Sequence, residues 1–502
     1  MREDWNRRAR EDAHFSVAFG RQNQDEAEFL ASAAEVAGIL EQEFTRLTPG
    51  PASGRRALEI GCGPGRLMLP MSRHFGEIHG VDISEEMAAM ARDRLRRTPH
   101  AHVHVTNGAD LAVAGDGQFD FIYSYTVFQH IPDPEIVRNY LAEARRALKV
   151  GGVLCCQLRG APPLYSEMDR ETVTWTGCHF SGEEMAAFAR ERDFHLVGLT
   201  GLDTQYMWTT FVKPGDACAA DFSRTALKAV TASGSGENRV PARGRDAVVS
   251  LWIDGLPAGC HLGNLEASFL PPVAPHDYRH LGGRHLGGLR ASARETRTRG
   301  CYLSALTETG GCQMNVRVPK GMAAGRVEVA LWFEDRRLGQ PKSIEVFPPA
   351  PRKPKVLWVS DGIAINSKYR IEMGGVKVTM EDVELPHEVS FTVAGRPAEL
   401  LQFECRDPVT DTYEFAFLLS PKTRLGVERL EARASGRKLP PIPIEIAGLS
   451  GRPPAKLPGG QAKNQQRDAQ ARGAGDAPLR PAVEGKPNFA RALTRWLNYE
   501  KP

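Results

Sequence analysis

The stretch Ala57-Leu58-Glu59-Ile60-Gly61-Cys62-Gly63-Pro64-Gly65 decides how the first part of this chain folds. A short apolar segment runs into a turn with glycine at alternate positions, and glycine is needed where the backbone takes positive φ or lies directly against a ligand. The spacing differs from the dinucleotide fingerprint, whose third glycine comes one residue later and whose helix N-terminus binds a pyrophosphate. The carboxylate of Glu59 would repel a pyrophosphate. The stretch therefore predicts a strand and a loop that binds a ligand with a positive centre.

Strand and helix signals alternate after this loop. The further apolar segments that we interpret as strands are 78–83, 102–105, 119–124, 149–154, 194–199 and 208–213. Helical signals separate them, including a helix from Glu85 to Arg97 for which Ser84 is the expected N-cap. This alternation predicts a parallel α/β sheet. Asp82 ends the second strand, a position that places a carboxylate over the ribose hydroxyls of a nucleoside.

The order of these landmarks resembles class I S-adenosylmethionine-dependent methyltransferases over residues 30–213. The resemblance is carried by Glu-x-Gly-x-Gly-x-Gly from Glu59, Val-Asp-Ile-Ser from Val81, Asn-Gly-x-Asp-Leu from Asn107, Phe-Asp from Phe119 and Arg-x-Leu-Lys-x-Gly-Gly from Arg146. It implies a Rossmann-like α/β domain over residues 1–213, with a seven-stranded, mostly parallel sheet whose last strand is antiparallel. It also implies S-adenosyl-L-methionine as cofactor and methyl transfer as activity.

The resemblance also implies roles for individual residues. Glu59 and the backbone of the glycine loop would hold the methionine moiety, Asp82 the ribose hydroxyls, and Ile83 would pack on the adenine. Asn107 and Gly108 would address the adenine edge, with Asp110 as the alternative for that contact. The cofactor-binding set expected from the sequence is Glu59, Gly61, Gly63, Gly65, Asp82, Ile83, Asn107, Gly108, Asp110 and Ser124.

Histidines are the remaining candidates for chemistry. His130 follows the fourth strand, near where a methyl acceptor should approach, and its unperturbed pKa suits a general base. The alternative for His130 is a purely structural hydrogen bond in the loop before Pro132. We expect no metal site, because neither His102 with His104 nor the histidines 276, 280 and 285 have carboxylate or thiol partners at a familiar ligand spacing.

The remainder of the chain predicts β-rich modules and a tail. We interpret residues 214–247 as a linker with a short helical piece around Phe222–Val230. Residues 248–349 and 352–447 repeat a pattern of short alternating strands, which indicates two immunoglobulin-like sandwiches with a weak resemblance to IPT/TIG modules. Trp252 and Trp358 are expected in their cores. Residues 448–487 should be disordered, and residues 488–499 should form a short amphipathic helix.

Charge and composition limit the classes of binding partner and the cellular location that we expect. Residues 1–215 carry 23 Lys and Arg against 30 Asp and Glu, a net charge of −7. This net negative charge disfavours a nucleic acid as methyl acceptor, while a local basic groove stays open as the alternative. No run of eighteen apolar residues and no apolar leader is present, and the nine cysteines form no Cys-x-x-Cys pair, which favours a cytoplasmic protein with reduced thiols.

The acceptor should be enclosed by parts outside the sheet. The N-terminal segment with Trp5, Phe15 and Phe19, and the insertion Arg159–Phe180 with Trp175, are candidates for a lid over the cofactor. A small-molecule, glycan or lipid-linked acceptor fits such an enclosure, with O- or N-methylation open. The alternative is a cofactor-sensing scaffold whose sandwiches bind a partner or carbohydrate. The C-terminal helix could dock on a protein or a membrane surface, or pack on the protein itself.

Overall fold

The computed structural model describes residues 1–18, 24–161, 177–215, 221–271, 295–307, 310–362, 368–372, 374–420 and 422–449. Several sequence predictions concern other residues: Phe19, most of the insertion with Trp175, the histidines 276, 280 and 285, and nearly all of the tail with its helix lie outside the described residues. The chain divides into two compact units. The first comprises residues 1–11, 30–162 and 177–351, and the second comprises residues 12–29, 163–176 and 352–502. The boundary at residue 12 coincides with a kink in the first helix at Asp12.

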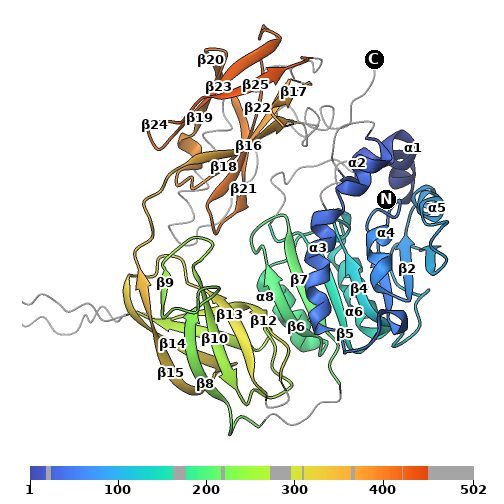
Figure 1. The fold of residues 1–502 in the computed structure, drawn as a ribbon, viewed down its shortest axis with the longest axis vertical. Coiled ribbons are helices and arrows are strands. Elements are labelled where there is room, and N and C mark those ends of the chain that lie inside the picture. Colours follow the sequence, from blue (N-terminus) through green and yellow to red (C-terminus); the bar gives the residue numbers. More distant parts are fainter. Residues whose placement is uncertain are drawn as a thin grey trace, which may run out of the picture. The chain divides into compact units, whose positions relative to one another are not determined.

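The first unit begins with the α/β domain drawn in blue to green in Figure 1. Its helices are α1 (Arg2–Ala18, which continues past the boundary), α3 (Ala34–Gln42), η1 (Glu43–Arg46), η2 (Ala52–Gly54), α4 (Met68–Met71), η3 (Ser72–His74), α5 (Glu85–Arg94), η4 (Phe128–His130), α6 (Pro134–Ala147) and α8 (Gly182–Glu191). The short helix α2 (Glu26–Ala31) crosses the other boundary between the units. The strands of the domain are β1 (Arg56–Ile60), β2 (Glu77–Asp82), β3 (Ala101–Val105), β4 (Phe119–Ser124), β5 (Leu148–Leu158), β6 (His195–Thr200) and β7 (Met207–Val212).

These strands form one sheet in the order β3-β2-β1-β4-β5-β7-β6. Strands β1 to β5 pair with one another in parallel, and β7 is antiparallel to both β5 and β6. The order reverses at β1, so the loops after β1 and β4 diverge at the carboxyl edge of the sheet, where ligands bind in this architecture. The expected Rossmann-like α/β fold is confirmed.

Helices cover both faces of this sheet. Alternate residues of β1 separate the two sides: Leu58 and Ile60 belong to a core with residues of α6 and α8, whereas Ala57 belongs to a core with residues of α3 and α4. The capping box at Ser181 and the N-cap Ser84 begin α8 and α5, because each side chain accepts a backbone N–H that the helix itself leaves unpaired.

A β-rich region completes the first unit. Its strands are β8 (Ala226–Ala232), β9 (Arg239–Pro241), β10 (Val248–Asp254), β11 (Leu265–Leu270), β12 (Thr296–Leu303), β13 (Cys312–Arg317), β14 (Gly325–Phe333) and β15 (Arg336–Phe347). The helical piece expected around Phe222–Val230 is wrong, because those residues lead into β8, which pairs with β10. Burial of Leu227, Val230 and Ala232 in the apolar core of this unit outweighs the weak helical preference of the segment.

The β-rich region is joined to the α/β sheet inside this unit. Tyr302 of β12 pairs with Gly198 of β6, and the Leu262 N–H donates to the Leu196 carbonyl at 2.7 Å. Arg299 donates to Glu183 of α8 at 2.7 Å and to the Leu262 carbonyl at 2.7 Å. One cluster of buried apolar residues runs from the α/β domain into the β-rich region. The contacts therefore make one continuous core of the two parts.

The second unit contains another all-β region. Its strands are β16 (Lys355–Asp361), β17 (Arg370–Ile371), β18 (Gly375–Glu381), β19 (Ser390–Val393), β20 (Arg396–Ala398), β21 (Leu400–Asp407), β22 (Thr412–Leu418), β23 (Gly426–Ala434), β24 (Arg437–Lys438) and β25 (Ile442–Ile446), with the turn η6 (Pro386–Glu388). One sheet has the order β16-β18-β22-β21, and the other has the order β17-β25-β23-β19-β20 with β24 on β23. Their inner faces share one apolar core.

The two repeat tryptophans are not where the sequence prediction placed them. The side chains of Val249, Leu251 and Ile253 are buried, so Trp252 lies on the opposite face of β10 and is 43% exposed, with its indole N–H on Thr231. Trp358 is half-buried under the Lys368 ammonium, 4.6 Å from the ring centre. The prediction of core positions was wrong because residues on a strand alternate between its two faces.

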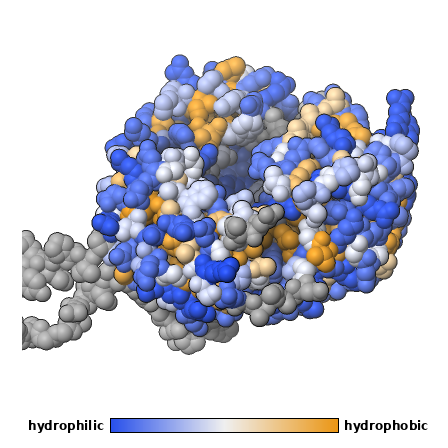
Figure 2. Space-filling view, turned by 60° about the horizontal axis from the view of Figure 1, so that its bottom comes forward, coloured by the Kyte–Doolittle hydropathy of each residue, from blue (hydrophilic) through white to orange (hydrophobic). Residues whose placement is uncertain are grey.

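The molecular surface is mixed in polarity. On the face drawn in Figure 2, hydrophobic residues occur as separate patches between hydrophilic ones. Among the described residues, no helix is both long and apolar enough to cross a membrane.

Candidate active site

The glycine loop begins where β1 ends. The N–H groups of Gly61 and Cys62 both donate to the Val81 carbonyl of β2, at 2.8 and 3.0 Å, which holds the turn between the two strands. Gly61 has a φ of 71°, and a Cβ there would lie 2.3 Å from a methyl carbon of Val127 in the loop after β4. A side chain is therefore excluded at Gly61 by both conformation and space. The expected conformation of this loop is what the structure shows.

Asp82 lies at the end of β2 and is fastened to the glycine loop. One carboxylate oxygen accepts the Gly63 N–H at 2.8 Å and the other accepts the Ser84 N–H at 2.8 Å. Burial raises the pKa of this carboxyl, while its backbone hydrogen bonds, with Ser84 the strongest, act in the opposite direction. Each oxygen keeps a further lone pair, so the orientation of Asp82 is fixed while it can still accept ribose hydroxyls.

The positions expected around the adenine come together in part. Gly108 has a φ of 84°, and a Cβ on it would lie 2.3 Å from the terminal carbon of Ile83. The Asn107 amide instead bonds within its own turn: its N–H₂ donates to Asp110 at 2.7 Å, and its oxygen accepts the Ala109 N–H. That hydrogen bond lowers the pKa of Asp110. Ile83 and Gly108 thus meet directly, whereas Asn107 and Asp110 shape the loop.

Glu59 is buried in a polar environment of its own. Its Oε2 accepts the Tyr123 hydroxyl of β4 at 2.9 Å, and Glu59 itself is 3% exposed. Burial raises the pKa of the Glu59 carboxyl to about 8, against the opposing effects of the Tyr123 hydroxyl and the Arg66 charge. Among the described residues no ion pair neutralises this carboxylate at hydrogen-bonding distance. A buried acid of this kind suits a cationic ligand group.

Arg66, which the sequence analysis missed, lies beside Glu59. It is 5% exposed, donates to the Ser32 carbonyl and hydroxyl at 3.0 and 3.1 Å, and stands 5.8 Å from the Tyr125 ring centre. Its Nε–H is buried and has no hydrogen-bond partner among the described residues. An unpaired buried donor is costly, so the site fits a ligand that brings an acceptor. The sequence signal was an arginine placed directly after the last loop glycine.

Together these residues fit S-adenosylmethionine. Its methionine end carries an ammonium and a carboxylate, which match the buried Glu59 carboxyl and the unpaired Arg66 donor. The glycine loop, Asp82 and Ile83 with Gly108 adjoin that region in chain order and in space. Ser124 differs from this set: its hydroxyl donates to the Ile60 carbonyl at 2.9 Å and is fully buried, so it ties β4 to β1.

His130 ends η4 and is buried. Its ring meets the Trp5 ring edge-on, with centroids 5.4 Å apart and planes at 74°. The chain around it is tied down: the Gly177 N–H donates to the Gln129 carbonyl at 2.6 Å, and the Cys178 N–H donates to the Ile131 carbonyl at 2.8 Å. The end of the insertion therefore adjoins the loop that carries His130.

The start of α1 lies over the carboxyl edge of β2 and β3. The Asn6 side-chain oxygen accepts the Ser84 hydroxyl at 2.6 Å, and Arg2 donates to the Thr106 carbonyl at 2.7 Å. Arg2 and Arg10 also form ion pairs with Glu85 and Glu86 in the first turn of α5. The start of α1 thus lies at the edge that carries Asp82, and its role as a lid stays a prediction. Phe15 belongs to the second unit.

Comparison with known proteins agrees with this geometry. Residues 57–152 match the family described as "Methyltransferase domain". The chain is 31% identical over 135 residues to a ubiquinone biosynthesis O-methyltransferase from Ruegeria sp. (strain TM1040), covering 26% of this chain and 52% of that protein. It is 34% identical over 124 residues to the protein of the same name from Cereibacter sphaeroides (strain ATCC 17025 / ATH 2.4.3), covering 24% and 49%.

The chain spans about half the length of the curated relatives it matches. Among solved structures, a geranyl diphosphate C-methyltransferase from Streptomyces coelicolor A3(2) superposes with a TM-score of 0.30 and 17% identity, covering 39% of this chain and 89% of that one. The family match falls on the residues that build the glycine loop, Asp82 and the loop after β4. This chain therefore contains a class I S-adenosylmethionine-dependent methyltransferase domain.

Proposed function

We propose that this protein transfers the methyl group of S-adenosylmethionine to an oxygen atom of a small-molecule acceptor. The observation that carries the proposal is a buried acid, Glu59, near a buried arginine, Arg66, whose Nε–H has no hydrogen-bond partner among the described residues. The names of the relatives, ubiquinone biosynthesis O-methyltransferases, support oxygen as the acceptor atom. The cofactor supplies a methyl group on a positively charged sulfur.

The residues have separate tasks in this proposal. Glu59 and Arg66 hold the two charges of the methionine end, and Asp82 orients the ribose. Ile83 and Gly108 form a flat apolar contact for the adenine, and the lid formed by the start of α1 excludes water. Most of the rate enhancement then comes from positioning, because the transfer is a direct displacement.

His130 is the proposed general base. The imidazole of His130 lies against the aromatic ring of Trp5. A methyl acceptor with a flat apolar body would suit such a site. A hydroxyl acceptor must lose its proton as the new bond forms, and an imidazole is suited to take that proton near neutral pH.

The test is an acceptor screen on the full chain. Purified protein is incubated with the cofactor and with matched phenols, amines and aliphatic alcohols, and formation of S-adenosylhomocysteine is measured. We expect turnover with phenols and little turnover with amines. Glycan- and lipid-linked alcohols belong in the same screen. Turnover only with amines would contradict the oxygen assignment, and cofactor binding without turnover on any class would favour a sensing role.

A further inference from the structure

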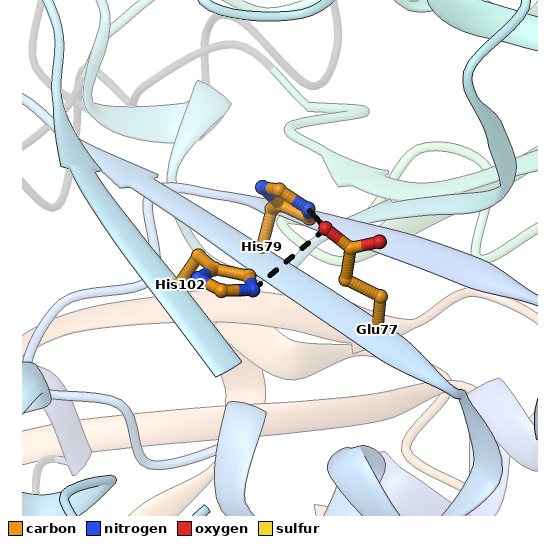
Figure 3. A group of neighbouring side chains, drawn as sticks. All are labelled: Glu77, His79 and His102. Atoms are coloured by element: carbon orange, nitrogen blue, oxygen red, sulfur yellow. Dashed lines mark hydrogen bonds and ion pairs between the residues drawn. The ribbon is translucent and has the colours of Figure 1, made fainter. Parts of the chain in front are cut away.

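A cluster of imidazoles and a carboxylate lies on β2 and β3, away from the site described above. The sequence analysis found no carboxylate near His102, but Glu77 and His79 come from the neighbouring strand. His79 and His102 are direct partners in the parallel register, and Glu77 stands two residues before His79 on the same face of β2. Figure 3 shows both rings directed at one Glu77 oxygen.

The distances suit a small metal ion. Nε2 of His79 is 2.8 Å and Nε2 of His102 is 3.7 Å from Oε1 of Glu77, and the candidate ligand atoms all lie within 4.8 Å of one another. Zinc bonds of roughly 2.0–2.1 Å at tetrahedral angles place two ligand atoms about 3.3 Å apart. The observed separations of 2.8 and 3.7 Å lie on either side of that value, so small side-chain rotations would bring the three ligand atoms to the spacing that zinc requires.

The surroundings fix the ligands as a metal site requires. The second oxygen of Glu77 pairs with Nε of Arg56 at 2.7 Å, which leaves Oε1 for the imidazoles. Nδ1 of His79 lies 3.2 Å from Nε2 of His104, so His104 can hold the tautomer in which Nε2 of His79 is free to bind. The rings of Phe119 and His79 form a T-shaped contact, with centroids 5.3 Å apart.

We propose that Glu77, His79 and His102 bind a divalent zinc ion, with water as the fourth ligand. Two imidazole nitrogens and one carboxylate oxygen form a donor set that zinc takes in proteins. The Glu77 and His102 side chains are 28% and 44% exposed, so water and metal reach them. The ion would join the edge strand β3 to β2.

The position of the proposed zinc site, at the opposite end of β2 from Asp82, indicates a structural role for the ion. Glu77 begins β2 and Asp82 ends it, and five residues of strand span about 16 Å. The ion would therefore lie far from the reacting groups and stabilise the sheet edge. Zinc binding is independent of the proposed methyl transfer, so either proposal can fail without the other.

The test is calorimetric titration of the metal-free full chain with zinc chloride, compared with His102→Ala and Glu77→Gln. His102 is exposed, so its variant should fold, and glutamine preserves the size of Glu77. We expect one zinc ion per chain, with affinity reduced more than about 100-fold in either variant, since losing a direct ligand should exceed the 10–100-fold cost of losing a supporting one. Zinc should also raise the melting temperature of the wild type by about 2–4 °C.

His74→Ala is the matched control, because His74 also pairs with a glutamate, Glu41, at 2.9 Å, but has no second imidazole among the described residues at that pair. It should bind zinc as the wild type does. Replacing zinc with cobalt distinguishes the proposed site from a site made of cysteine thiolates. Cobalt bound by nitrogen and oxygen ligands lacks the thiolate charge-transfer band. Three results would each overturn the proposal. They are equal zinc affinity in His102→Ala, Glu77→Gln and the wild type, a cobalt thiolate band that persists in every variant, and no zinc binding by the wild type.

Discussion

Trp5 of the first helix meets His130 of the loop after β4 edge-on, with ring centroids 5.4 Å apart. The two residues are more than a hundred positions apart in the chain, yet both lie on the carboxyl side of the sheet. If His130 is the base and the N-terminal segment is the lid, as proposed above, acceptor binding and proton transfer both involve this one ring contact.

Replacing these two residues should have different effects. His130→Ala should lower kcat by about 10²–10⁴-fold for a hydroxyl acceptor while cofactor affinity stays unchanged. Trp5→Ala should mainly raise KM for the acceptor, and Trp5→Phe, which preserves an aromatic edge, should restore it. Steady-state kinetics together with cofactor titration measure both effects. Parallel loss of cofactor affinity and turnover in His130→Ala would show that this histidine is structural.

Asp82→Ala should weaken binding of the cofactor and of its demethylated product. Each charge-assisted hydrogen bond to the ribose contributes about 1.5–3 kcal/mol. Because Asp82 also holds the Gly63 and Ser84 N–H groups, Asp82→Asn should lose less affinity than alanine does. Calorimetry gives the affinities, with Asp93→Ala on the exposed side of α5 as control. Unchanged affinity in Asp82→Ala would remove the ribose assignment.

Cofactor binding should release a proton near neutral pH. The raised pKa of Glu59, about 8, means that its carboxyl is protonated in the free protein at pH 7. The cofactor ammonium favours the ionised form, so binding expels the proton and affinity rises as the pH increases toward 8. Titration calorimetry in buffers with different ionisation enthalpies counts the protons. Glu59→Gln should abolish the release, and an unchanged proton count in that variant would assign it to another group.

His261 should make the first unit sensitive to acid. Burial lowers the pKa of His261 to about 3, with smaller contributions from His195, Arg190 and Arg299. Below about pH 6.5 the His261 imidazole is protonated in the unfolded chain but stays neutral in the folded chain. The free energy of unfolding therefore falls as the pH decreases from 6.5 toward 3, by about 1.4 kcal/mol per pH unit.

The matched variant is His261→Asn, since asparagine can keep the acceptor that takes the Gly263 N–H at 3.0 Å. Its denaturation midpoint should depend less on pH across that window than the midpoint of the wild type. His74→Asn, on the surface, should retain the wild-type slope. An identical slope in His261→Asn would assign the acid sensitivity to carboxylates.

Local sequence patterns predicted the α/β domain well and the side-chain clusters less well. The loop glycines and Asp82 were found because each lies in a short motif whose geometry depends on near neighbours. Arg66 escaped notice because its partner, Ser32, comes from a distant helix region. Glu77 and His79 were missed because only the register of β2 with β3 brings them to His102.

The β-rich parts show the same limit. The alternation in β10 was correctly taken as a strand, but which face is inward depends on the partner sheet, so Trp252 was placed on the wrong side. The strand β8 was mistaken for a helix because its backbone partner, β10, and the core that buries its apolar residues both come from later parts of the chain. The secondary-structure preference of a short segment has little predictive value where pairing with a strand distant in sequence determines which residues are buried.

The pairing of β12 with β6 has a practical consequence for anyone dissecting this protein. A truncation after Lys213 would leave the outer backbone groups of β6 unsatisfied and open to association with other chains. It would also cut through the buried apolar cluster that the α/β domain shares with the β-rich region. An expression fragment that ends after Pro351 retains its own protection against aggregation.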